Sequence, residues 1–134
     1  MISWLERNKS ISWAITLIIA IIIFYVSSLS FKAGEGGSNL NAILYHLVIF
    51  FILGFFLLIS LLGGKKKYLI LCLGILAAVF YALLDEIHQF FVPGRYSSIS
   101  DVLVDSLGII YAAMIYFIII KYRENKNVFP YFKE

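Results

Sequence analysis

Residues 85–108, DEIHQFFVPGRYSSISDVLVDSLG, join two long apolar stretches of the chain and decide how it folds. They include four acids, one histidine and one arginine, whereas residues 68–84 before them and 109–120 after Gly108 carry no charge. Charged side chains are costly inside a bilayer, so they lie at its edge or face protein and water. The segment therefore predicts a turn at a membrane boundary with an apolar helix on either side. Its charged residues are the first candidates for function.

The composition of the chain is that of an integral membrane protein. Of its 134 residues, 62% are hydrophobic and 14% are charged, and the mean hydropathy is +0.94. Soluble domains average roughly half apolar and a quarter charged residues. We expect a single domain, residues 1–134, with no separate soluble domain beside the apolar segments. The only cysteine, Cys72, excludes an intrachain disulfide.

Four apolar stretches are long enough to cross a bilayer as helices: residues 11–29, 42–62, 68–89 and 101–120. A helix rises 1.5 Å per residue, so about 20 residues cover the roughly 30 Å of hydrocarbon. The fourth stretch reaches this length only when it begins at Asp101, which draws Asp105 into the membrane. The sequence thus predicts an all-α fold: a polytopic membrane protein with four transmembrane helices in a small bundle.

The basic residues indicate how this bundle is oriented. Most of them flank three span ends: Arg7 and Lys9, then residues 65–67, then Lys121, Arg123 and Lys126. The loops after the first and third spans hold only Lys32 and Arg95. By the positive-inside rule, both termini and the lysine loop are cytoplasmic in the cell membrane. Because the basic clusters flank apolar segments, membrane orientation explains them better than nucleic-acid binding.

In this orientation the unusual polar residues lie at one level, on the outer side. They are His46 near the start of the second span, Asp85, Glu86 and Gln89 near the end of the third, and Asp101 and Asp105 at the start of the fourth. The third and fourth spans each align acids with small residues at helical spacing. These stripes are Asp85 and Gln89 with Gly74, Ala78 and Ala82, and Asp101 and Asp105 with Gly108 and Ala112. Because small residues allow close helix packing, we expect both stripes to face each other or a shared neighbour.

Structural explanations account for part of this pattern. Ser98 and Asp101 have the spacing of a capping box, which leaves Asp85, Glu86 and Asp105 unexplained. Imidazole and carboxylates suit several divalent ions, but no HExxH or comparable ligand spacing occurs. We therefore expect no metal and no cofactor. Phosphate-binding glycine loops and nucleophile elbows do not occur either.

The motif Asp85-Glu86-x-x-Gln89-x-Phe-Val-Pro-Gly-Arg95, followed by Asp101 and Asp105, resembles the VanZ-like family of small membrane proteins. The resemblance extends to His46 at the start of the second span and covers residues 24 to about 116. It implies a multi-pass membrane protein with a possible role in resistance to lipid-tailed glycopeptide antibiotics such as teicoplanin. Asp105 stands where the family often has asparagine, and the family's lysine shortly before the histidine has no counterpart here.

These observations predict that the polar cluster binds or processes the headgroup of a cell-envelope lipid or a lipoglycopeptide antibiotic. Asp85, Glu86 and Asp101 are the candidates for catalysis, if there is catalysis, or for holding sugar or ammonium groups. The candidates for ligand binding are His46, Gln89, Arg95 and Asp105, with Arg95 suited to phosphate or carboxylate.

A non-catalytic membrane binding or assembly subunit is the alternative, with Arg95 paired to Asp85 or Asp101 in a structural salt-bridge network. The expected partners are membrane lipids, envelope precursors or lipoglycopeptides, and not nucleic acid. A bundle of four short helices also makes a homo-oligomer a possible assembly.

Overall fold

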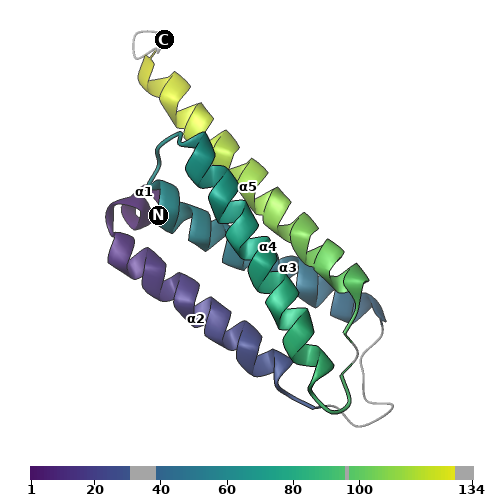
Figure 1. Ribbon diagram of the computed structural model, residues 1–134. Coiled ribbons are helices and arrows are strands. Elements are labelled where there is room, and N and C mark those ends of the chain that lie inside the picture. Colours follow the sequence, from purple (N-terminus) through teal and green to yellow (C-terminus); the bar gives the residue numbers. More distant parts are fainter. Residues whose placement is uncertain (31–38, 96, 129–134) are drawn as a thin grey trace.

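The protein is a bundle of helices, shown in Figure 1 as a computed structural model that describes residues 1–30, 39–95 and 97–128. The helices are α1 (Ile2–Arg7), α2 (Lys9–Ser27), α3 (Asn39–Leu62), α4 (Tyr68–Phe90) and α5 (Ile99–Val128). The described residues form no strand. Four helices, α2 to α5, are long and apolar enough to cross a membrane. The all-α fold with four spans is thus confirmed, and Lys32 lies outside the described residues.

The helix ends differ from the predicted ones in ways that local contacts explain. Helix α1 was not predicted, because six residues are too few to show a hydrophobic period. Its end joins the start of α2, where the Ser12 hydroxyl donates a hydrogen bond of 2.7 Å to the Leu5 carbonyl. Helix α5 continues past the predicted end at residue 120, and Arg123 on this extension bonds to Glu6 of α1. The first contact spans seven residues, whereas the second joins residues 117 apart in the chain.

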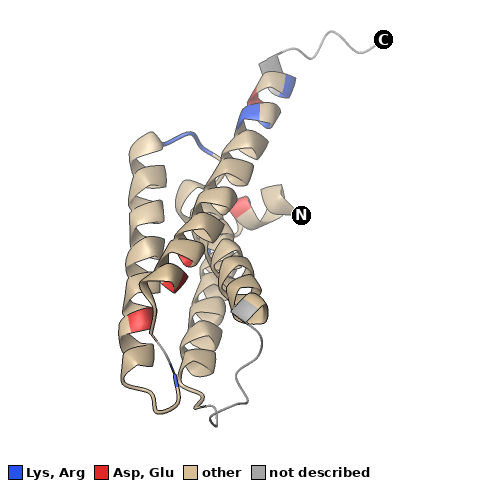
Figure 2. Cartoon of the chain, turned by 90° about the vertical axis from the view of Figure 1, so that its right-hand side faces the viewer, with Lys and Arg blue, Asp and Glu red and all other residues tan. Residues whose placement is uncertain are grey.

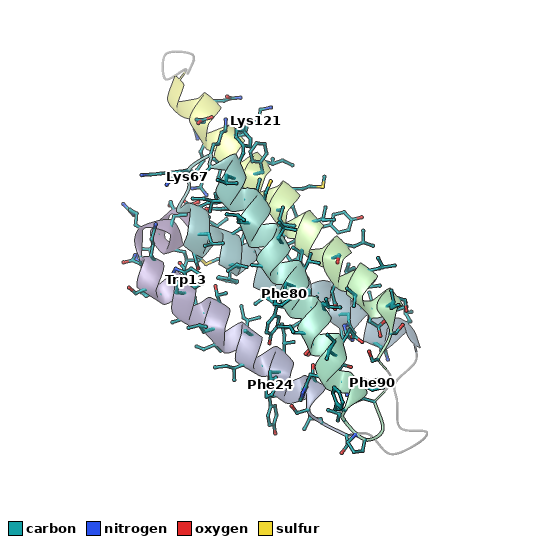
Figure 3. The ribbon with its side chains drawn as sticks, viewed as in Figure 1. Trp13, Phe24, Lys67, Phe80, Phe90 and Lys121 are labelled. Atoms are coloured by element: carbon teal, nitrogen blue, oxygen red, sulfur yellow. The ribbon has the colours of Figure 1, made fainter. Side chains whose placement is uncertain are left out.

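Helix α3 lies at the centre of the bundle. It packs against each of the other four helices and most extensively against α5. Its core side chains include Phe50, Leu58 and Ile59, all of which are almost fully buried. Phe24, Phe80 and Phe90, by contrast, point away from the bundle and are exposed (Figure 3). An exposed apolar surface of this kind suits contact with lipid tails.

The small-residue stripes of α4 and α5 both face inward, as predicted. The buried residues of α4 are Gly74, Ala78, Ala82, Asp85, Glu86 and Gln89. On α5 the residues Asp105, Gly108 and Ala112 are buried. A Cβ atom on Gly74 would lie 2.9 Å from side-chain atoms of α3, and one on Gly108 only 2.4 Å from the Leu47 carbonyl oxygen. The shared neighbour of the two stripes is therefore α3.

A polar contact closes the end of the bundle that carries the lysine loop. The carboxylate of Glu6 accepts hydrogen bonds from the Tyr116 hydroxyl (2.9 Å) and from Arg123 (2.6 Å). The Tyr116 oxygen in turn accepts one from the Gly64 backbone N–H at 3.0 Å. These bonds join α1, the α3–α4 loop and α5. Sequence reasoning missed Glu6, because its two partners lie 110 and 117 residues away.

Replacing Glu6 with glutamine should lower the free energy of unfolding by about 1–2 kcal/mol, since a hydrogen bond to a charged group contributes about 1.5–3 kcal/mol and Arg123 is partly exposed. Unfolding in mixed detergent and SDS micelles measures this change. The matched control is Glu124→Gln, which removes the more exposed pair with Lys66 and should change stability by less than about 0.5 kcal/mol. Equal effects of the two substitutions would contradict a buried role for Glu6.

Candidate functional site

The predicted polar residues meet at the other end of the bundle, between α3, α4 and α5. His46 lies on α3, Glu86 on α4 and Asp105 on α5, each about 6–11 Å inside the nearer end of its helix at 1.5 Å per residue. Figure 2 shows the acids near the end of α4 and the start of α5 in the lower half of the bundle and most lysines and arginines towards its upper end. Because α4 runs antiparallel to α3 and α5, its end lies beside the starts of those two helices, and the three residues lie at a similar depth (Figure 1).

His46 and Asp105 form the most deeply buried pair of the site. Their Nδ1 and Oδ1 atoms are 3.0 Å apart, and the residues are 5% and 0% exposed. The imidazole also stacks on Phe50, with ring centroids 6.5 Å apart and nearly parallel planes. The carboxylate and the phenyl ring together fix the orientation of the imidazole. The second carboxylate oxygen of Asp105, Oδ2, is buried without a hydrogen-bond partner.

On α4, Gln89 holds two carboxylates with one amide group. Its Nε2 donates to Asp85 Oδ2 at 2.9 Å and to Glu86 Oε1 at 3.3 Å, as residues three and four apart on a helix can. All three side chains are buried, at 5% exposure or less. Asp85 Oδ1 is a second buried oxygen without a partner. The predicted grouping of these residues on one inward face is therefore present.

Glu86 also caps the start of α5, which corrects the expected capping box. In a capping box the third helical residue, here Asp101, accepts a bond from the N–H of the capping residue. Instead, Glu86 Oε2 accepts the Ser98 N–H at 2.9 Å, while the Ser98 hydroxyl accepts the Ser100 N–H at 3.2 Å. The Asp101 side chain is thus not used for the cap. One ligand atom each of His46, Glu86 and Asp101 lies within 4.8 Å of the other two.

Arg95 contacts α2. In the α4–α5 loop, Gly94 takes a φ of 80°, which glycine adopts without strain. The next residue, Arg95, donates from Nε to the Leu29 carbonyl at 3.0 Å and from Nη2 to the Val26 carbonyl. Within the described segments, no ion pair joins Arg95 to Asp85 or Asp101, so the predicted pairing was wrong. The guanidinium thus holds two carbonyls at and just beyond the end of α2, and the Val26 carbonyl also accepts the Leu29 N–H at 3.1 Å.

His88 lies apart from the acids. Its Nε2 is 3.0 Å from the Ser28 hydroxyl, and its ring stacks on Phe24 with centroids 4.6 Å apart. Like Arg95, it connects the end of α4 to α2. Residues two apart on a helix do not face each other, so Glu86 and His88 point in different directions from α4.

The electrostatics of the site follow from its four carboxylates, those of Asp85, Glu86, Asp101 and Asp105. Among residues 1–30, 39–95 and 97–128, no Lys or Arg forms an ion pair with any of them. Of the residues that the structure describes, His46 is the only basic side chain in the cluster, and it carries at most one positive charge. Buried charges require a compensating partner. The cluster therefore favours a cation, an ammonium group or a donor of several hydrogen bonds.

Comparison with known proteins agrees with this architecture. The family model described as VanZ/LLP1 matches residues 6–120. Those residues include the four spans up to Ile120 and all seven predicted site residues. No curated protein and no solved structure matches the chain. Because the family model covers most of its length, the chain belongs to the VanZ/LLP1 family.

Proposed function

We propose that this protein of the cell membrane, with both termini in the cytoplasm, binds or processes a lipid-linked polar headgroup at the outer leaflet. The headgroup belongs to a cell-envelope lipid or to a lipid-tailed glycopeptide antibiotic, so the protein contributes to teicoplanin resistance. Family membership and the four apolar helices support a multi-pass VanZ-like protein. The concentration of basic residues at the end opposite the acids supports the orientation.

One observation carries the proposal: buried polar side chains from three helices converge, and two carboxylate oxygens among them have no partner. Helix capping uses one oxygen of Glu86 and explains neither Asp85 Oδ1 nor Asp105 Oδ2. Unsatisfied buried acceptors lower stability by about 1–3 kcal/mol each, so a bound group that satisfies them is the natural explanation. Hydroxyls of a sugar or an ammonium group provide such donors.

The residues have distinct roles in this proposal. Asp85, Glu86 and Asp101 hold the hydroxyl or ammonium groups of the headgroup, or transfer protons if the headgroup is processed. Gln89 keeps two of these carboxylates in place. Arg95, on the same loop as Ser98, recognises the phosphate or carboxylate of the headgroup with its planar guanidinium.

A second candidate function is a non-catalytic binding or assembly subunit. One observation favours it: Arg95 and His88 both use their polar groups to hold α2 against the end of α4. This arrangement maintains the bundle without any chemistry. Turnover of a defined lipid by the purified protein would support the catalytic version over this one.

The proposed function is tested by the variants Asp85→Asn and Glu86→Gln, which remove charge with little change in shape. We expect cells producing either variant to be as sensitive to teicoplanin as cells without the protein. We also expect envelope lipids to be lost from the purified variants, as read by mass spectrometry. Glu124→Gln, an exposed acid at the opposite end, is the matched control and should behave as wild type. If folded Asp85 and Glu86 variants retain both resistance and lipids, the proposal is wrong.

A further inference from the structure

We propose that His46, Glu86 and Asp101 form a binding site for a divalent transition-metal ion, and that Asp105 is the residue that orients His46. The inference goes beyond headgroup binding and does not rest on it. Spacing along the chain does not indicate this site, because each of its three ligands lies on a different helix. Only the packing of α3, α4 and α5 brings them together.

The first support is distance. One ligand atom of each residue lies within 4.8 Å of the other two. Nitrogen and carboxylate ligands lie about 2.0–2.2 Å from zinc, so two ligands of the same ion are at most about 4.4 Å apart. The observed separations exceed this limit by at most about 0.4 Å, so the three atoms are already near the spacing of one coordination sphere.

The second support is the orientation of the imidazole. His46 Nδ1 is 3.0 Å from Asp105 Oδ1, so Nδ1 is the atom that carries the proton in the neutral ring. Nε2 is then the nitrogen with a lone pair for a metal. A metal-bound histidine usually makes such a bond from its other nitrogen to a carboxylate, which fixes the ring and raises its basicity. Asp105 is thus a positioning residue.

The third support is independent of the ligand distances: the site holds four carboxylates, and among the described residues only His46 can offer them a positive charge. Asp105 is completely buried and points at His46, yet its Oδ2 has no partner. Asp85 is only 5% exposed, and its Oδ1 atom has no hydrogen-bond partner. Its other oxygen, Oδ2, accepts a hydrogen bond from the Gln89 amide, which also bonds to Glu86. A divalent cation at the centre compensates for these carboxylates.

The ligand set indicates the class of metal. One imidazole with two carboxylates suits zinc, manganese or iron, whereas magnesium and calcium prefer oxygen ligands alone. Asp101 is partly exposed, which gives an ion a route from the surface. Three protein ligands also leave an open position for water or a substrate oxygen, as in catalytic zinc sites.

The test uses the full chain purified in detergent, stripped with a chelator and titrated with Zn²⁺ or Mn²⁺ by calorimetry. We expect saturable binding of one ion per chain. Glu86→Gln, Asp101→Asn and His46→Gln should abolish it, and Asp105→Asn should weaken it by about 10- to 100-fold. The control Glu124→Gln should bind as wild type. Co²⁺ gives a second readout, since its visible spectrum reports a nitrogen and oxygen ligand field that the Asp101→Asn variant should lack.

Absence of saturable binding to the folded wild-type protein would overturn the inference, and so would equal affinity of wild type and the three ligand variants. If protons rather than a metal ion neutralise the carboxylates, the wild-type protein will show no saturable metal binding. Asp101→Asn serves as the decisive variant if a change at a more buried position prevents folding, because Asp101 is partly exposed. These titrations contain neither lipid nor antibiotic. Failure to bind a metal ion therefore does not contradict headgroup binding, which has its own test. Loss of resistance in the Asp85 variant, in turn, does not decide metal binding, which these titrations test.

Discussion

Replacement of Asp105 by alanine should lower the free energy of unfolding by about 2–4 kcal/mol, because a buried donor left without an acceptor costs about 1–3 kcal/mol and the cavity adds to this loss. The substitution leaves His46 buried at 5% exposure without its carboxylate partner. It also leaves a cavity beside α3 where the helices pack most closely. Unfolding in mixed micelles, followed by helical circular dichroism, measures the loss.

Asp105→Asn is the matched control, because it keeps the size and shape of the side chain. The amide oxygen still accepts the His46 Nδ1–H, while one buried charge and one unpartnered carboxylate oxygen disappear. In metal-free protein we expect its stability to lie within about 1 kcal/mol of wild type, because a partner for His46 remains. If asparagine were as damaging as alanine, the His46 hydrogen bond would not be what stabilises this layer.

Replacement of Gly108 by valine should have an effect of similar size, about 3 kcal/mol or more, because the overpacking is against backbone. A Cβ atom there would lie 2.4 Å from the Leu47 carbonyl oxygen and 3.0 Å from the Phe51 nitrogen. Backbone atoms inside a helix cannot rotate away, so α3 and α5 must separate. Since Leu47 follows His46 in sequence, and Gly108 is one turn from Asp105, this separation also disrupts the buried pair. A lower melting temperature together with loss of metal binding in the Gly108→Val variant would show this disruption.

Two controls test the close-packing argument. Gly54→Ala meets its nearest atom, the Ile109 Cα, at 3.3 Å, so it should be tolerated better than any substitution at Gly108. Leu107→Ala changes the residue next to Gly108, which is 50% exposed on the apolar surface, and should have the smallest effect. A Gly108→Val variant as stable as Leu107→Ala would contradict close contact between α3 and α5.

The fold was predictable because it depends on the length and hydropathy of each segment, which can be read from that segment alone. Four apolar stretches of sufficient length identify the four crossings without knowledge of their contacts. The inward faces of α4 and α5 were also predictable, since helical spacing alone aligns Asp85 with Ala82 and Asp105 with Gly108. The depth of His46 followed from its distance to the start of the second apolar stretch.

Interactions between distant segments were decided only by the tertiary structure. Glu86 rather than Asp101 accepts the Ser98 N–H, and Arg95 contacts the end of α2 rather than an acid. Hydrophobic period and residue spacing specify which face of a helix is buried, but they do not specify its neighbour or the register between two helices. His46, Glu86 and Asp101 therefore occur as three separate signals in the chain, and the packing of α4 and α5 against α3 makes them one site.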